Sequence, residues 1–285
     1  MKTVNSLSGG KTSSYIAANY PADYNVFALV RTDDKKCIYP DAKVRQIVSD
    51  KIGKEFIGTL EMDEIINTIL DLEQFIGKKI IWLSGVTYEG LLGLPQNNVL
   101  PSPIRRYCTA LLKNKPIFDW CRNNLKNEIC EMRIGFRANE QNRANNVLKK
   151  CINGILYDKY IYSKNPSGTN KWKTIPYSKP TFPLIKNNIY KDNIELYWKD
   201  KPVRFATLNN CVGCFHRHPA LLRKLWDSHT KKMQYFADLE KNRKYPNDTL
   251  KADESLTYER IKNWNIQTEL SFDDFNECDS GYCGL

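Results

Sequence analysis

Short apolar runs alternate with amphipathic segments through the first half of the chain. Apolar runs bounded by glycine, proline and polar residues are typical of buried strands, whereas apolar residues that recur every three or four positions are typical of helices. The runs predict strands at 4–7, 25–30, 56–57, 79–83 and 129–134. The recurring positions predict helices at 12–18, beyond Pro40, at 65–76 and at 111–125. This alternation predicts an α/β fold, with a doubly wound and mostly parallel sheet covered by helices on both faces.

The pattern weakens in the second half of the chain, where aromatic, lysine and proline residues interrupt it. There we expect an exposed loop at 164–179 and a helix at 219–240, followed by a charged tail that ends in cysteines. The chain therefore divides into a main α/β domain at 1–200 and a smaller, helical, cysteine-containing region at 201–285.

The chain is basic, with 43 lysines and arginines against 32 acidic residues and a net charge of +11. Such an excess suits a polyanionic partner, such as a nucleic acid or a phosphate-bearing metabolite. Because the lysines are spread along the chain, a merely basic surface explains them equally well. No signal-peptide pattern and no run of roughly 20 apolar residues is present, so we expect a soluble, cytoplasmic protein without a membrane partner.

Nine cysteines are present, an odd number in a chain without an export signal. Such a count argues against a disulfide framework and favours reduced thiols that bind a metal or a cluster. Cys211 and Cys214 are separated by two residues, one of them glycine, so their thiolates can converge on one metal or one cluster corner. Four others lack ligand spacing and are more typical of a protein core: Cys37, Cys121, Cys130 and Cys151.

A serine and glycine loop follows the first predicted strand and precedes the first predicted helix. Its residues are Ser8, Gly9, Gly10, Lys11, Thr12 and Ser13. Backbone N–H groups at such a helix start bind anions, and the lysine and the hydroxyls add donors. A Walker A loop needs a glycine where Asn5 stands, so the loop does not match that of an ordinary P-loop NTPase. The alternative is a glycine-rich turn that has no ligand.

The loop resembles the Ser-Gly-Gly-Lys loop of the PP-loop superfamily, which includes phosphoadenosine phosphosulfate (PAPS) reductases, tRNA thiolases and DNA phosphorothioation enzymes. The resemblance implies a PP-loop (HUP-type) fold and an adenine nucleotide, either ATP or PAPS, with Mg²⁺ as a further expected ion. Thr32 and Asp33 resemble the segment that meets the adenosine in PAPS reductases. The order of these motifs, continued by a Pro-Leu segment at 183–184, extends the resemblance over residues 1–200.

The stretch from Gly135 to Arg143 resembles the Gly-x-Arg-x-x-Glu-Ser-x-x-Arg element of the reductases, with Gln141 in place of the serine. On this resemblance Gly135, Arg137 and Glu140 contact the nucleotide. Arg137 and Arg143 would form a fork for phosphate or sulfate oxygens, and Glu140 would hold one arginine in place. Lys11, Arg137 and Arg143 are the expected catalytic cations. A solvated, charged helix start is the alternative interpretation.

The segment 105–116 resembles the Cys-Cys-x-x-Arg-Lys-x-x-Pro segment of cluster-bearing adenylyl-sulfate reductases, with Cys108 on the first cysteine and Thr109 replacing the second. With Cys211 and Cys214 this gives three ligands, and either Cys278 or Cys283 supplies a fourth. A tail cysteine, Cys283, could instead be a catalytic nucleophile, as in PAPS reductases. A [4Fe–4S] cluster is the expected group, and a structural Zn²⁺ or unliganded thiols are the alternatives. Two histidines next to the pair are alternative zinc ligands, phosphate contacts or surface residues: His216 and His218.

Together these features predict a nucleotide-dependent enzyme of the PAPS reductase family that carries out sulfur transfer or reduction. The basic, aromatic segment 157–179 favours a nucleic-acid acceptor, DNA or tRNA, over a free metabolite. A sulfur donor protein is a further expected partner. The alternative is a zinc-stabilised nucleic-acid-binding protein that does not turn over nucleotide.

Overall fold

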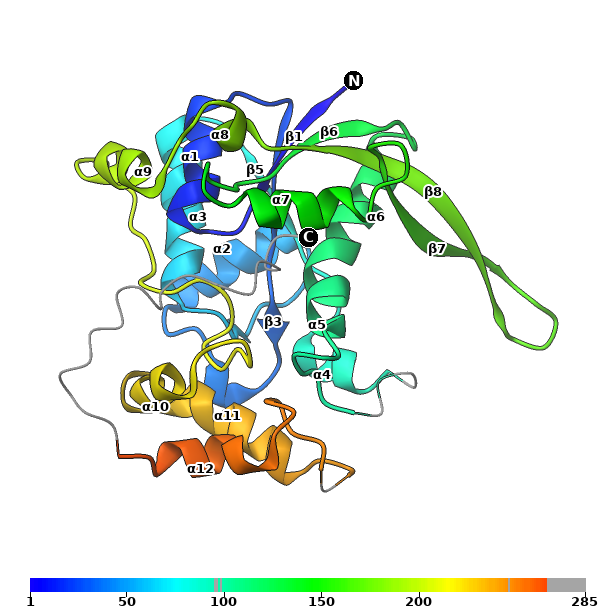
Figure 1. Ribbon diagram of the computed structural model, residues 1–285. Helices are drawn as coiled ribbons and strands as arrows, with labels where there is room; N and C mark the ends of the chain where they lie inside the picture. Colours follow the sequence, from blue (N-terminus) through cyan, green and yellow to red (C-terminus); the bar gives the residue numbers. More distant parts are fainter. Residues whose placement is uncertain (95–96, 98, 246, 266–285) are drawn as a thin grey trace.

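The computed structural model describes residues 1–94, 97, 99–245 and 247–265 (Figure 1). Its main sheet has six strands in the order β5-β2-β1-β6-β8-β7. Their bounds are β1 Thr3–Leu7, β2 Tyr24–Ala28, β5 Ile80–Leu83, β6 Cys130–Arg133, β7 Leu156–Lys164 and β8 Asn170–Thr181. Every neighbouring pair is parallel except β7 with β8. The predicted α/β fold with a mostly parallel sheet is therefore confirmed.

Helices cover both faces of this sheet, because alternate side chains of each strand enter two separate cores. Phe27 packs in one core with residues of α1 (Lys11–Asn19) and α3 (Glu64–Ile76). Its neighbour Val26 packs in the other core, with residues of α6 (Lys115–Asn124) and α7 (Gln141–Leu148). The helices predicted at 12–18, 65–76 and 111–125 are confirmed, the last as α6 preceded by α5 (Tyr107–Thr109) and a π-helical segment, η2 (Ala110–Asn114).

The helix predicted beyond Pro40 is also confirmed, as α2 (Ala42–Ile52), which the Asp41 carboxylate caps by accepting from two backbone N–H groups. The strand predicted at 56–57 is wrong as a member of the main sheet. The extended residues are instead β4 (Gly58–Thr59), which pairs antiparallel with β3 (Arg31–Thr32) in a separate sheet. Phe56 is buried as a core residue, and so short an apolar run does not distinguish a strand from a buried loop.

The loop predicted at 164–179 is wrong, because most of it belongs to a β-hairpin formed by β7 and β8. Pro176 and Pro180 suggested a break, since proline donates no hydrogen bond to a sheet. In the structure the β7–β8 register shifts between Leu156 and Tyr157, beside Pro176, and this irregularity accommodates the proline. The hairpin extends away from the body of the molecule (Figure 1).

Two short helices, α8 (Pro183–Lys186) and α9 (Lys191–Trp198), follow the hairpin. The helix predicted at 219–240 is two helices, α10 (Pro219–Ser228) and α11 (Thr230–Lys241), which meet at His229, whose backbone angles are not helical. With α12 (Tyr258–Lys262) they bury Trp226, Phe236 and Tyr258 in the same core as α3. The division at residue 200 stays a prediction. None of the described helices is both long and apolar enough to span a membrane.

Candidate functional site

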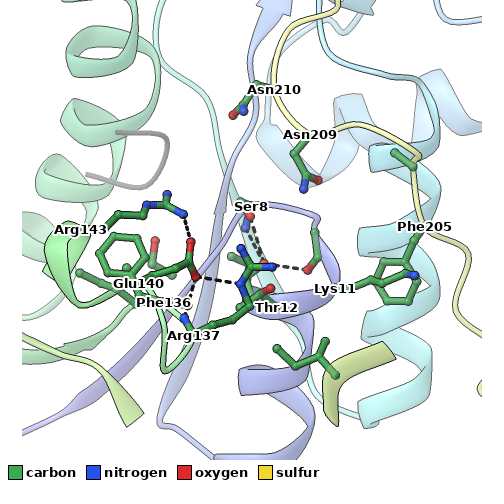
Figure 2. Close-up of a pocket in the computed structure, with 18 of the residues that line it drawn as sticks. Ser8, Lys11, Thr12, Phe136, Arg137, Glu140, Arg143, Phe205, Asn209 and Asn210 are labelled. Carbon is green, nitrogen blue, oxygen red and sulfur yellow. Dashed lines mark hydrogen bonds and ion pairs between the residues drawn. The ribbon is translucent and has the colours of Figure 1, made fainter. Parts of the chain in front are cut away.

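A cavity of about 510 Å³ opens at the carboxyl ends of the central parallel strands (Figure 2). Leu7 and Ser8 line it at the end of β1, Ala28 at the end of β2, and Ile134 and Gly135 just after β6. Ligands of open α/β sheets bind at this edge, because the strands end there in loops that lead into helices. The predicted serine and glycine loop and the predicted arginine fork both line the cavity.

The loop of residues 8–13 presents the amino end of α1 to the cavity. Gly10 is the N-cap residue and makes no side-chain capping bond, so the first-turn N–H groups face the space. The Ser13 hydroxyl accepts from the Ser8 backbone N–H and donates to the Gly10 carbonyl, both at 3.1 Å. Gly9 has a φ of +77°, and a Cβ there would lie 2.6 Å from Ile65 Cγ2, so both conformation and packing require glycine.

Lys11 stands at the first position of α1 and lines the cavity. Its ammonium forms an ion pair with the Glu195 carboxylate of α9. The indole N–H of Trp198, one turn further along α9, donates to the Lys11 carbonyl at 3.0 Å. Helix α9 therefore fixes the lysine at the edge of the anion-binding loop, and Glu195 supplies its counter-charge.

Two arginines share one carboxylate on the opposite wall of the cavity (Figure 2). One Glu140 oxygen accepts from the Arg137 backbone N–H at 2.7 Å and from its Nε at 3.0 Å, and the other accepts from Arg143. The Arg143 guanidinium also lies 4.5 Å from the centre of the Phe136 ring. A Cβ on Gly135 would lie 3.2 Å from the Ser13 backbone, so this glycine lets the arginine pair approach the loop.

Glu140 is the group on which we expect the stability of this arginine pair to depend. Burial raises the pKa of its carboxyl, but hydrogen bonds from Arg137 and the charge of Arg143 outweigh burial, and the pKa lies below the ordinary 4.5. Its stabilising effect is therefore full above that ordinary value and is lost as the pH falls through the lowered one. We predict that Glu140→Gln lowers the free energy of unfolding by about 2 kcal/mol at neutral pH.

Urea denaturation of both proteins over a pH series measures this difference, which should shrink below about pH 4.5. Glu254→Gln is the control, because Glu254 is exposed and distant from the cavity lining. A difference that is equally large for the control, or that does not change with acid, would contradict this role of Glu140.

Thr32 and Asp33 do not line the cavity. The Thr32 hydroxyl donates to a Glu89 oxygen at 2.5 Å, and the Asp33 backbone N–H donates to the other at 2.9 Å. Glu89 lies in α4 (Tyr88–Leu92) and also accepts from the Tyr235 hydroxyl of α11. In this structure the two residues connect β3 with the C-terminal helices, and their contact with adenosine stays a prediction.

Cys108, Cys211 and Cys214 gather from two separate parts of the chain. Burial raises the pKa of the Cys108 thiol to about 11, and nearby Cys214 adds to the effect. Burial also raises the pKa of Cys211 far above its ordinary value, with further contributions from Glu61 and Cys214. Within the described ranges no three histidine, cysteine or acidic side chains form a group that could hold a metal ion. Cys278 and Cys283 lie outside those ranges, so their roles stay predictions.

An ion pair that sequence analysis missed joins the cavity to the cysteines. Lys113 lines the cavity and donates to a Glu61 oxygen at 2.7 Å. Glu61 is buried and forms an isolated β-bridge with Cys211. Its second carboxylate oxygen is also buried and has no hydrogen-bond partner among the described residues. The available sequence signal was that the acidic Glu61 directly follows the apolar Leu60. This signal did not reveal its partner Lys113, which lies 52 positions away.

The two histidines differ in their surroundings. His216 Nε2 is buried without a hydrogen-bond partner in the described part of the chain, and burial together with Arg106 and Lys251 lowers its pKa to about 4. His218 is the N-cap residue of α10, where its Nδ1 accepts from the Ala220 N–H at 3.3 Å. Among the cysteines that we expected in the protein core, Cys151 is half-buried. The other three are buried: Cys37, Cys121 and Cys130.

Asn209 and Asn210 complete the cavity lining between α9 and the cysteine pair (Figure 2). A Cβ on Gly10 would lie 2.8 Å from the Asn209 amide nitrogen, so this side chain lies directly over the anion-binding loop. Asn210 has a φ of +68°, which asparagine adopts more readily than most residues. Sequence analysis did not identify either residue, although two adjacent asparagines directly before a cysteine pair were a visible signal.

No protein-family model and no curated protein matches this chain. Among solved structures, the U34-tRNA thiolase NcsA from Methanococcus maripaludis with its [4Fe–4S] cluster is similar at 14% identity and a TM-score of 0.37. The alignment covers 100% of this chain and 80% of the thiolase chain. Similarity at this level carries no inference about the function of this chain.

Proposed function

We propose that this chain is a PP-loop enzyme that uses an adenine nucleotide, ATP, to activate an acceptor for sulfur transfer. The carrying observation is that one cavity combines the amino end of α1, Lys11 and the Arg137–Glu140–Arg143 group. Its lining also includes Lys113, whose partner Glu61 adjoins Cys211. The Lys113–Glu61 ion pair therefore connects a site suited to polyanions with the group of thiols.

The polar and apolar parts of the cavity suit the two ends of a nucleotide. Backbone N–H groups at 10–13 and the Lys11 ammonium suit phosphate oxygens, and Arg137 and Arg143 suit the charge that develops on leaving pyrophosphate. The apolar lining from Leu7, Ala28, Ile117 and Ile134 suits the adenine ring. A volume of about 510 Å³ is in the range of small-molecule sites. Mg²⁺ would accompany ATP.

The thiol group fits an iron–sulfur cluster better than a single ion. Each cysteine of a cluster binds a different iron, so its ligands need not converge on one point. Arg106 and Lys251 lie near the thiols and would offset the negative charge of thiolates. Cys108, Cys211 and Cys214 would hold three corners of a [4Fe–4S] cluster, and Cys278 or Cys283 is the proposed fourth ligand. A cluster held by these residues would supply a binding site for sulfur at the sulfide level, and a separate donor is the proposed source of that sulfur.

In the proposed reaction an acceptor oxygen attacks the α-phosphate of ATP and displaces pyrophosphate. A hydrosulfide from the sulfur donor then attacks the acceptor carbon that carries this oxygen, so that a carbon–sulfur bond forms, the carbon–oxygen bond breaks and AMP leaves. Lys11, Arg137 and Arg143 stabilise the charge on the departing phosphates, a type of electrostatic stabilisation worth about 10²–10³ in rate per donor. PAPS is the alternative nucleotide, with reduction in place of transfer. A nucleic acid, DNA or tRNA, is the proposed acceptor.

Anaerobic purification followed by an absorption spectrum, metal and sulfide analysis and a pyrophosphate assay tests this function. We expect a brown protein that contains iron and sulfide and releases AMP and pyrophosphate from ATP in the presence of acceptor. Sulfite release from PAPS would instead support the reductase alternative. A colourless protein with stoichiometric zinc and no nucleotide turnover would overturn the proposal in favour of a zinc-stabilised binding protein.

A further inference from the structure

The β7–β8 hairpin offers a surface that the cavity does not use. Only Ser178–Thr181 of β8 pair with the body of the sheet through β6, whereas the earlier part of β8 pairs with β7 alone. The hairpin therefore projects as a two-stranded arm (Figure 1). An arm of this kind exposes both faces near its tip, and a hairpin without further packing is only marginally stable by itself.

The two faces of the arm differ in their surroundings. Residues opposite each other in an antiparallel pair share a face, so Lys159 and Ile161 of β7 lie on the same face as Trp172 of β8. On the other face the Tyr160 ring packs 4.2 Å from the Arg122 guanidinium of α6, toward the body. The first face is open: Tyr157 is 39%, Ile161 45% and Trp172 50% exposed.

Lysines occur on both faces of the arm, among and opposite these exposed aromatic rings. The arm carries five lysines against one acidic residue, Asp158, and the lysines are Lys159, Lys164, Lys171, Lys173 and Lys179. None of the five forms an ion pair with a carboxylate in the described part of the chain. The Lys159 ammonium lies 5.1 Å from the centre of the Trp172 ring. Cation and aromatic face are thus presented together.

Three explanations of the arm are protection of a strand edge, binding to a membrane and binding to a nucleic acid, and its charge and exposed rings distinguish between them. Lysines alone would be explained by protection of an exposed strand edge from aggregation. That explanation does not require large exposed rings, which work against solubility. A planar membrane would meet one face of the arm, whereas Lys159 and Lys173 lie on opposite faces. A flexible polyanion with stackable bases complements both the rings and the two-sided charge.

We propose that the β7–β8 arm binds an unpaired nucleic-acid strand, with bases stacked on Tyr157 and Trp172 and phosphates paired with the lysines. That the bound strand is the acceptor of the reaction rests on the proposed function. Binding itself does not require nucleotide turnover. The arm would hold the acceptor at a distance from the cavity, so that a second part of the same strand reaches the reacting nucleotide.

Fluorescence anisotropy of the full chain with labelled single-stranded oligonucleotides, in the absence of ATP and over a salt series, tests the proposal. The double variant Tyr157→Ala, Trp172→Ala should weaken binding by at least about tenfold. Replacing Lys159, Lys171 and Lys173 with glutamine should lower the slope of log affinity against log salt by about 2. The matched control replaces three exposed lysines outside the arm: Lys186, Lys199 and Lys231.

Unchanged affinity and salt slope in both arm variants, or equal losses in the control, would overturn the assignment. Preference for a duplex of the same sequence would overturn the unpaired strand as ligand. Binding to phosphatidylserine vesicles in place of oligonucleotide would identify a membrane instead, and self-association abolished by the arm variants would identify a second copy of the chain. Circular dichroism spectra and urea denaturation midpoints equal to those of the wild type would show that the arm variants fold. Tight strand binding without any sulfur transfer would count against the proposed function alone.

Discussion

Replacement of Lys11 with methionine is expected to lower pyrophosphate release from ATP by about 10²–10³-fold, the usual cost of losing one preorganised donor at a reacting centre. The ammonium is positioned from both ends, since Glu195 holds its charge and Trp198 holds its backbone carbonyl. Methionine keeps the length and packing of the stem but removes the charge. The first-turn N–H groups of α1 would remain, so residual nucleotide binding should persist.

Steady-state pyrophosphate release and nucleotide binding, measured separately, check this expectation. Lys186→Met is the matched control, because Lys186 is exposed on α8 and does not line the cavity. Turnover of the Lys11 variant within a few-fold of the wild type would mean that the lysine is only a partner of Glu195. The cavity would then need another cation for phosphate charge.

The elements whose prediction the structure confirms are those with long, regular patterns of apolar residues. Ile65, Ile66, Ile69 and Leu72 recur at helical spacing and are fully buried in α3. The outer part of β8 was missed because it is not half-buried: residues 170–174 are exposed, so no alternation of apolar and polar residues marks them. Their strand conformation comes from pairing with β7, which a local pattern does not record.

The same distinction applies to the site. The anion-binding loop and the arginine pair are short continuous segments, so sequence could identify their residues before their mutual contact was known. The Lys113–Glu61 pair joins residues 52 positions apart, and Glu61 shows its importance only through its burial. Thr32 shows what a local resemblance leaves out, because the resemblance marked the residue as a nucleotide contact but did not reveal the Glu89 carboxylate that accepts from its hydroxyl.

The variants Cys211→Ser and Cys214→Ser should each lose nearly all bound iron and the visible absorption, and with it sulfur transfer. The loss should exceed the roughly 10–100-fold typical of removing an outer-shell partner, because a thiolate ligand itself is removed. Cys211 packs against the core that includes Val212, Phe236 and Tyr258, and serine is close to cysteine in size. ATP turnover should persist, since the loop and the arginine pair lie outside the thiol group.

Cys151→Ser is the matched control, because Cys151 is also half-buried and its thiol donates to the Val147 carbonyl, its one hydrogen bond within the described ranges. Iron analysis and pyrophosphate release on the same preparations separate the two halves of the proposed reaction. Retained iron in both variants would place the cluster elsewhere or exclude it. Loss of iron together with ATP turnover would show that the thiol group also supports the cavity, and the ion pair of Lys113 with Glu61 beside Cys211 is the contact through which that effect would pass.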